Sequence, residues 1–379
     1  MKKVYLDIAA TTPIDSDVIK LMSNIMATTF GKPSSIHKFG QESHSVIERS
    51  RLQLSNALNC LPSEIIFTGG GSESNNLVLH GILKPGDHVI TSSYEHPAIL
   101  NVVESLNKTG IESTLIRPNN NGIVECDSIE AALKPNTKLI SIMAINNEIG
   151  TINPLSQISQ LCQRNNIFFH SDAVQMLGKL PLDLSELTID FISFSAHKLY
   201  GPKGVGALYI RDGIHLQNIL QGGGQERNLR PGTENIAGIA GFGYAAEIAN
   251  KNLPNNIGHI IELEKYFLSQ LSLHNIHFTR HCKSHVPGLM NISFHDVDSN
   301  SLIMNLDIEG IAVSAGSACS SGVVKASKIL LDIGVSEKVA SESVRISLGK
   351  AHSVNDIDYT IEKLSEIILR LKNNTTTNE

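Results

Sequence analysis

The residues with the clearest chemical use lie where a short apolar run meets a polar, glycine-bounded turn. Residues 191–194 are typical of a buried strand, and the polar residues that follow include Ser195, His197 and Lys198. Partial desolvation at such a strand end lowers the pKa of a lysine amine, which suits Schiff-base chemistry. Ser195 and His197 offer hydrogen-bond donors for a phosphate. The segment therefore indicates a lysine that holds pyridoxal phosphate (PLP), although a lysine taken alone is more often a surface residue at a strand end.

A second strand-like run ends in a carboxylate. Residues 167–171 lead into Asp172, which precedes Lys198 by one strand and one connection. A carboxylate placed against the ring nitrogen of PLP keeps that nitrogen protonated, and the ring accepts electrons only in that state. Gln175 follows closely and has an amide that can donate to the phenolate oxygen of the cofactor. Asp172 by itself is equally consistent with a helix N-cap.

A glycine turn follows a third strand-like run, residues 65–68. The turn contains Gly71 and Ser72 and leads into an apolar helical stretch, residues 77–83. Glycines let backbone N–H groups approach an anion, a helix N-terminus favours negative charge, and Ser72 adds a hydroxyl. The spacing matches neither a Walker A motif nor a dinucleotide fingerprint, so this signal is weak by itself. Ligands of open α/β sheets gather at the carboxyl ends of strands, so the three strand ends support one another.

Strand-like and helical stretches alternate along much of the chain, which predicts an α/β fold with a mostly parallel, doubly wound sheet. The strands are continuous apolar runs, so we expect helices on both faces of the sheet. The expected strands are residues 65–68, 88–92, 113–116, 139–144, 167–170, 191–194 and 205–210, and residues 155–164 form one of the expected helices.

The polar segment 251–256 contains a proline and predicts a break between two helices. The pattern changes after it, which indicates a second domain. We therefore expect a large domain of residues 15–255 and a small domain made of residues 1–14 and 256–379.

Composition excludes several classes of protein. The chain has 379 residues, 41% of them hydrophobic, a net charge of -6 and a pI near 6.2, so it lacks the electrostatic footprint of a nucleic-acid-binding protein. Its N-terminus is not a signal peptide, and no apolar run is long enough to span a bilayer. Five cysteines without a C-x-x-C pattern do not suggest a disulfide framework. We expect a cytoplasmic protein with no membrane partner and no direct nucleic-acid partner.

Three potential metal ligands, His281, Cys282 and His285, lie close together in the sequence. The cluster lacks the second half of a metal site, so we expect a solvated loop and no bound metal.

The motifs at these strand ends resemble those of NifS- and IscS-type cysteine desulfurases, which are class-V-aminotransferase-like, fold-type-I PLP enzymes. The resemblance implies a large domain with a mainly parallel seven-stranded sheet flanked by helices, and a smaller α/β domain. The matching segments cover nearly the whole chain in order: residues 5–7, 9–13, 31–35, 70–76, 95–98, 146–151, 170–175, 195–198, 225–227, 232–235, 316–322 and 344–349.

The resemblance implies four catalytic residues. Lys198 carries the cofactor and acts as a base, Asp172 faces the ring nitrogen, and His96 stacks on the ring. Cys319 lies in a loop of small residues in the small domain, about 314–324, and accepts sulfur as a persulfide. Taken without the resemblance, Cys319 is as consistent with a buried structural cysteine.

The resemblance also implies the residues that bind cofactor and substrate. Thr233 matches a phosphate ligand donated by the neighbouring subunit, which implies a homodimer. Asn147 and Arg345 match the groups that hold the substrate carboxylate, a task that suits the fork of an arginine. The implied cofactor-binding set is Gly71, Ser72, His96, Asn147, Asp172, Gln175, Ser195, His197, Lys198 and Thr233.

The implied reaction removes sulfur from L-cysteine, gives L-alanine, and passes the sulfur to an acceptor or iron–sulfur scaffold protein for cluster assembly or for products such as thiolated tRNA. A selenocysteine lyase or a class-V aminotransferase of the same fold is the alternative, and the Cys319 loop argues against the aminotransferase. A non-catalytic protein that binds only PLP or a scaffold is disfavoured by the complete set of catalytic residues. An NAD- or nucleotide-binding enzyme lacks its glycine fingerprint.

Overall fold

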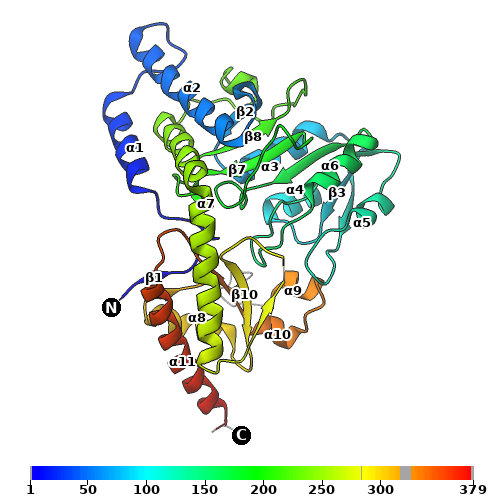
Figure 1. Cartoon of the computed structure of the whole chain (residues 1–379). Coiled ribbons are helices and arrows are strands. Elements are labelled where there is room, and N and C mark those ends of the chain that lie inside the picture. The colour runs from blue at the N-terminus through cyan, green and yellow to red at the C-terminus, as the bar shows by residue number, and fades with distance from the viewer. Residues whose placement is uncertain (1, 283, 316–325, 377–379) are drawn as a thin grey trace.

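The computed structural model describes residues 2–282, 284–315 and 326–376 (Figure 1). Its main sheet has the strand order β2-β8-β7-β6-β5-β3-β4, in which β8 runs antiparallel to both neighbours and the other pairs are parallel. The predicted mainly parallel, seven-stranded sheet is thus confirmed. The strands are β2 (Ile65–Thr68), β3 (His88–Ser92), β4 (Glu112–Ile116), β5 (Thr137–Ser141), β6 (Phe168–Asp172), β7 (Phe191–Ser195) and β8 (Gly206–Ile210).

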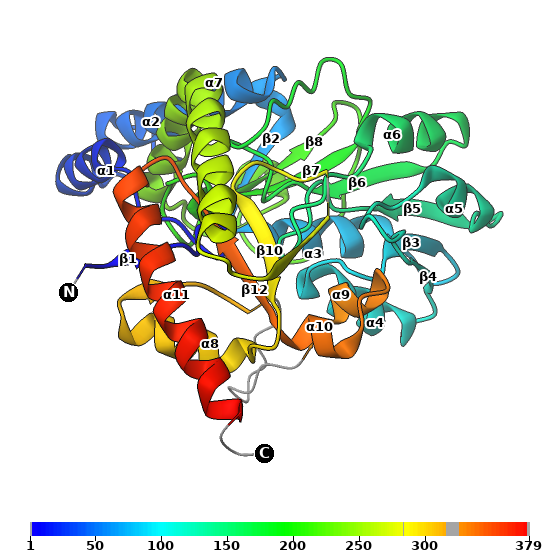
Figure 2. The ribbon, with the colours of Figure 1, turned by 60° about the horizontal axis from the view of Figure 1, so that its bottom comes forward.

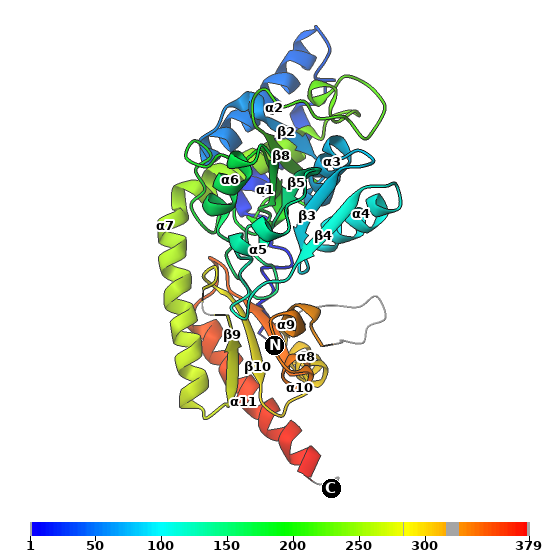
Figure 3. The same cartoon turned by 90° about the vertical axis from the view of Figure 1, so that its right-hand side faces the viewer.

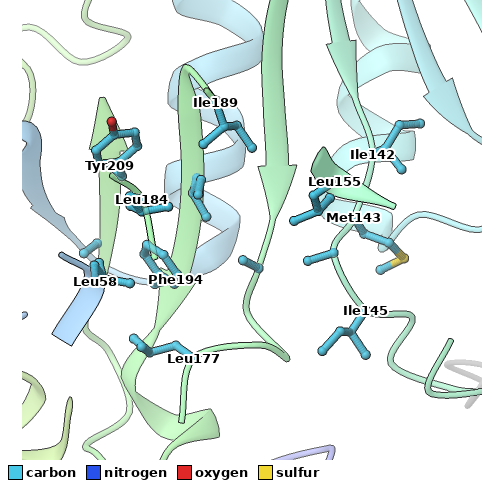
Figure 4. Packing of buried hydrophobic residues seen from close by; sticks show 14 of the residues in the cluster. Leu58, Ile142, Met143, Ile145, Leu155, Leu177, Leu184, Ile189, Phe194 and Tyr209 are labelled. Atoms are coloured by element: carbon cyan, nitrogen blue, oxygen red, sulfur yellow. The ribbon is translucent and has the colours of Figure 1, made fainter. Parts of the chain in front are cut away.

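Both faces of this sheet are apolar and covered, as the continuous apolar strands predict. On one face, the strands pack with α3 (Gly71–Ile82) and α4 (Pro97–Asn107). On the other face, they pack with α2 (Lys38–Leu58), α6 (Leu155–Arg164) and the N-terminal half of α7 (Ile236–Leu273). Figure 4 shows part of this second cluster around Phe194 and Tyr209. Burying a side chain such as Phe194 contributes about 1.5–3 kcal/mol, so this packing holds the strand ends in place.

A smaller sheet lies at the other end of the molecule (Figures 1 and 3). Its order is β12-β10-β9, all antiparallel, and a separate pair joins β1 to β11 in parallel. Its own apolar cluster includes Leu6, Phe267, Ile292 and Ile361. The elements are β1 (Val4–Tyr5), β9 (Phe278–His281), β10 (Leu289–Phe294), β11 (Ile311–Ala312), β12 (Ser343–Ser347), α8 (Ser299–Ile308), α9 (Lys328–Asp332), α10 (Glu337–Ser341) and α11 (Val354–Thr376).

The apolar clusters of the main sheet are separate from that of the small sheet, which supports the proposed division into residues 15–255 and residues 1–14 with 256–379. The remaining elements are α1 (Ser16–Thr28), α5 (Cys126–Ala131) and three short 3-10 helices, η1 (Pro62–Glu64), η2 (Ala196–Lys198) and η3 (Glu226–Asn228).

The predicted helix break at residues 251–256 is wrong. Helix α7 continues through Pro254 and runs from the main sheet to the small one (Figure 2). A proline inside a helix removes one backbone hydrogen bond and costs about 3 kcal/mol. Helix α7 packs against α1, α2 and α11, and tertiary packing of this kind can offset that cost.

The prediction of a solvated loop at residues 281–285 is also wrong for its first residue, which belongs to a strand. His281 ends β9, is buried, and is hydrogen-bonded to Ser293 at 2.7 Å. His285 contacts Glu264 at 2.9 Å, so this ring lies against a carboxylate. Within the residues described, no group of three or more His, Cys, Asp or Glu side chains has the arrangement of a metal site, and no helix is long and apolar enough to cross a membrane.

Candidate active site

Lys198 ends the short helix η2, directly after β7, as the strand-end pattern predicts. Its Nζ donates to the backbone oxygens of Ala9 at 2.7 Å and Ala10 at 2.8 Å. Burial, together with the nearby charge of Arg345, lowers the pKa of Lys198 to about 8. A sizeable neutral fraction near neutral pH makes this amine a nucleophile and a base.

Asp172 ends β6, the parallel neighbour of β7, so it shares an edge of the sheet with Lys198. Its side chain is buried. Oδ2 accepts from the side-chain nitrogen of Asn75 at 2.7 Å, and Oδ1 accepts from the backbone of Val174 at 3.0 Å. Two neutral donors thus orient the carboxylate.

The glycine turn joins β2 to α3. Gly70 has a φ of +152°, which favours glycine, and a Cβ at Gly71 would lie 2.6 Å from a methyl group of Val174. The hydroxyl of Ser195 lies 3.9 Å from where a Cβ at Gly70 would stand. The turn, the N-terminus of α3 and Ser195 therefore form one cradle, with Ser72 exposed in its first helical turn.

Two histidines flank the lysine. His96 is exposed at the start of α4, and its Nδ1 accepts from the backbone of Ala98 at 3.1 Å, which leaves the proton on Nε2. Desolvation lowers the pKa of His96, the charge of Lys198 acts in the same direction, and that of Asp172 opposes it. Burial lowers the pKa of His197 to about 4, and its Nδ1 lies 3.0 Å from the Thr11 hydroxyl. The His197 ring is therefore neutral at pH 7.

Arg345 lies on β12 of the small sheet and is buried. Its Nη2 contacts a carboxylate oxygen of Asp7 at 2.7 Å, and its Nη1 donates to the backbone oxygen of Asn147 at 2.9 Å. The third nitrogen, Nε, is buried and has no partner among the described residues. Arg345 is also close enough to Lys198 to lower the pKa of the amine, so the two predicted residues come together from different sheets.

Gln175 is buried and shares a backbone partner with the lysine. Its Nε2 donates to the backbone oxygen of Ala9 at 2.8 Å, and this is the same oxygen that Lys198 contacts. The expected donation to a cofactor oxygen stays a prediction.

Thr233 is exposed in the segment between η3 and α7. Arg230, in the same segment, pairs at 2.9 Å with Glu73 in the first turn of α3, so the segment lies beside the glycine turn. Its expected action in a partner subunit stays a prediction. Cys319 and residues 316–324 of its loop lie outside the described residues.

Sequence reasoning assigned no role to several residues that position the site. Asn75 orients Asp172, Thr11 contacts His197, Thr12 donates to the backbone oxygen of His197 at 2.9 Å, and Asp7 pairs with Arg345. These residues lie within the motifs that resemble the cysteine desulfurases, and that resemblance was the sequence signal that could have pointed to them. Their partners are far away in the sequence, so spacing alone could not reveal the pairing.

The donor set suits PLP. Asp172 is a buried carboxylate that forms no ion pair with the side chains described, so its charge can face a protonated ring nitrogen. The Gly70 turn lies beside the Ser195 hydroxyl at a helix N-terminus, which is a setting that suits a phosphate. The amine of Lys198 is bonded only to carbonyl oxygens in the contacts above, so it can leave them for an aldehyde.

Known proteins resemble this chain in sequence and in fold. A model of the aminotransferase class-V family matches residues 4–360. Cysteine desulfurase IscS of Dictyoglomus turgidum is 42% identical over 377 residues, which cover 98% of this chain and 96% of that relative. A solved NifS-like protein has a TM-score of 0.92 at 34% identity and covers 98% of this chain and 100% of its own. A structure of SspA in complex with cysteine has a TM-score of 0.82 at 32% identity and covers 93% of this chain and 100% of its own.

The family match and the relatives both extend over nearly the whole length of the chain. The chain therefore belongs to the class-V aminotransferases, a family of PLP-dependent enzymes, and within it to the cysteine desulfurases of the IscS and NifS type.

Proposed function

We propose that Lys198, Asp172, His96 and Cys319 remove sulfur from L-cysteine and leave it as a persulfide on Cys319. When bound at Lys198, PLP supplies a ring that takes up the electron pair freed at the substrate Cα. The observation that carries the proposal is the shared edge of β6 and β7, where a buried carboxylate and an amine with a pKa of about 8 lie together.

Each side chain has one task. Lys198 accepts the proton from the substrate Cα, because its lowered pKa of about 8 leaves roughly a tenth of the amine neutral at pH 7, far more than in an ordinary lysine. Asp172 holds the proton on the ring nitrogen. His96 covers the ring and moves a proton through Nε2, since its Nδ1 is occupied by the backbone of Ala98. The glycine turn with Gly71, Ser72, Ser195 and His197 holds the phosphate.

Arg345 binds the substrate carboxylate, assisted by Asn147. A buried N–H without a partner costs about 1–3 kcal/mol, and Nε of Arg345 is such a group within the part of the chain described. In the proposed complex the substrate carboxylate pairs with the guanidinium and satisfies this nitrogen.

Sulfur transfer balances without an added oxidant or reductant. The Cys319 sulfur attacks the substrate sulfur, the bond between that sulfur and the substrate Cβ breaks, and the carbon takes up a proton. L-cysteine and one thiol thus give L-alanine and one persulfide. Ser314, where the cysteine segment begins, exchanges both backbone hydrogen bonds with Arg345, at 2.7 and 3.2 Å, which supports delivery of Cys319 to the site.

The proposal includes a homodimer in which Thr233 binds the phosphate of the neighbouring site, as its exposure permits. It includes delivery of the sulfur to an acceptor or iron–sulfur scaffold protein in the cytoplasm.

The test is to incubate the purified, PLP-loaded protein with L-cysteine and a reducing thiol, and to measure alanine and sulfide together. We expect equal amounts of both. Alanine without sulfide would contradict the proposal. Parallel reactions with L-selenocysteine and with L-alanine plus a keto acid separate the selenocysteine lyase and aminotransferase alternatives.

A further inference from the structure

Lys179 takes part in the site although nothing in the proposed reaction uses it. It follows β6, and its Nζ donates to Oε1 of Gln175. The other end of that amide, Nε2, donates to the backbone oxygen of Ala9, which also accepts from Lys198. A continuous chain of hydrogen bonds therefore runs from Lys179 through Gln175 and Ala9 to the amine that would carry the cofactor.

These contacts decide which way the Gln175 amide faces. The Ala9 oxygen can only accept a hydrogen bond, so it requires the NH2 end of the amide. Lys179 supplies an N–H, so it requires the oxygen end. Turning the amide over would place two acceptors together at Ala9 and two donors together at Lys179. An NH2 group has two N–H bonds, so one remains after the bond to Ala9 is made.

The contact holds in either protonation state of Lys179. Burial, together with the charges of Lys198 and Arg345, lowers the pKa of Lys179 from its ordinary value of 10.5 to about 7. A neutral amine keeps two N–H bonds and an ammonium keeps three, so Lys179 can donate to Gln175 throughout the neutral range.

We propose that Lys179 is a positioning residue, which orients the Gln175 amide so that its second N–H faces the ring oxygen of the cofactor. The inference rests on the proposed function, which places PLP on Lys198. A donor at that oxygen stabilises its anionic form and makes the neighbouring nitrogen less basic. Loss of the orientation should therefore raise the pH at which the absorption of the Lys198-bound cofactor changes.

The test is a pH titration of the absorption spectrum of the loaded enzyme without cysteine. We expect Lys179→Met to raise the midpoint by about one pH unit. Gln175→Leu should produce a similar rise. Lys179→Arg keeps a donor for the Gln175 oxygen, so it should not raise the midpoint as Lys179→Met does. Lys179→Ala removes the same donor and serves if Lys179→Met does not fold.

The double variant Lys179→Met with Gln175→Leu decides how Lys179 acts. If Lys179 acts through Gln175, the double variant has the midpoint of Gln175→Leu alone. If Lys179 acts only through its own charge, the two shifts add, which overturns the inference, as does an unshifted Lys179→Met. A wild-type protein that shows no cofactor absorption would instead contradict the proposed function.

Discussion

The side-chain nitrogen of Asn75 lies 2.7 Å from a carboxylate oxygen of Asp172. Asn75 belongs to the first turns of α3, the helix that begins at the glycine turn, whereas Asp172 ends β6. One helix therefore fixes both the proposed phosphate cradle and the proposed partner of the ring nitrogen. If α3 moved relative to β6, the distance between the phosphate cradle and Asp172 would change. A bound cofactor has to span that distance.

The charge of Asp172 should matter more than its hydrogen bond. We expect Asp172→Asn to retain PLP and to slow alanine formation about a thousandfold, equivalent to ~4 kcal/mol of barrier. Asn75→Ala keeps the charge and should slow the reaction about tenfold, the loss of one hydrogen bond to a charged group. Steady-state alanine formation and cofactor absorbance measure both effects. Near-wild-type turnover of Asp172→Asn would contradict the role.

The capture of PLP should follow the ionisation of Lys198. Its folded pKa of about 8 lies below the ordinary value of 10.5, so the reactive neutral amine increases as the pH rises toward 8. The rate at which PLP-free protein forms the lysine-bound chromophore should rise about tenfold per pH unit below pH 8 and level off above it. Stopped-flow absorbance checks this. A rate that keeps rising beyond pH 10 would mean that the amine is not desolvated.

Borohydride reduction identifies the lysine. Treating the loaded enzyme with borohydride should fix a pyridoxyl label on Lys198, and peptide mass spectrometry locates it. The matched control is Lys198→Ala, which should carry no label. A label on Lys179 or Lys203 in the wild type would overturn the assignment.

Cys319 should act in sulfur transfer and in no earlier step. Cys319→Ser should still show the change in cofactor absorbance when cysteine is added, while persulfide and sulfide disappear. The other four cysteines, with free thiols in the described residues, are the controls: serine variants of Cys60, Cys126, Cys162 and Cys282 should stay active. Wild-type sulfide release by Cys319→Ser would show that this thiol is not the acceptor.

Two inactive variants should complement each other if the site is shared between subunits. Thr233→Asp places a carboxylate against the phosphate of the neighbouring site, and Lys198→Ala removes the cofactor amine. In a mixed dimer one site has Lys198 and an intact Thr233, so mixing should restore up to about a quarter of wild-type activity. Native mass spectrometry confirms subunit exchange. Exchange without recovered activity would place Thr233 in its own chain's site or away from the phosphate.

A buried ion pair joins helix α2 to the short helix η3, which precedes the Thr233 segment in the chain. Arg51 and Glu226 are both buried, and two contacts of 2.7 and 2.9 Å join them. Glu226 begins three successive residues with positive φ, a strained conformation for residues other than glycine. Arg51→Met leaves the carboxylate buried without its partner and should lower the free energy of unfolding by about 3–5 kcal/mol. Urea unfolding measures this, and Glu226→Gln combined with Arg51→Met should recover much of the loss.

The local elements could be predicted from the sequence with few errors. Strands β2 and β3 and helix α6 begin and end where the apolar patterns predict. Strand β5 stops at Ser141, earlier than the predicted Ala144, because its ladder with β3 ends there. Beyond it, the backbone of residues 142–144 bonds to the end of β6, to Glu95 and to Asn153. The error at Pro254 has the same origin, since packing around α7 outweighs a local preference.

The sequence by itself determined the chemistry: a lysine, a carboxylate and a glycine turn at three strand ends, and the family motifs that connect them. Only the tertiary structure decided which groups meet. Asp172 is held by Asn75, Arg345 reaches Asp7 and the surroundings of Lys198, and Lys179 sets the Gln175 amide. Most of these pairs join residues far apart in the chain. Strand order and the docking of the small sheet bring them together, and local periodicity carries no information about either.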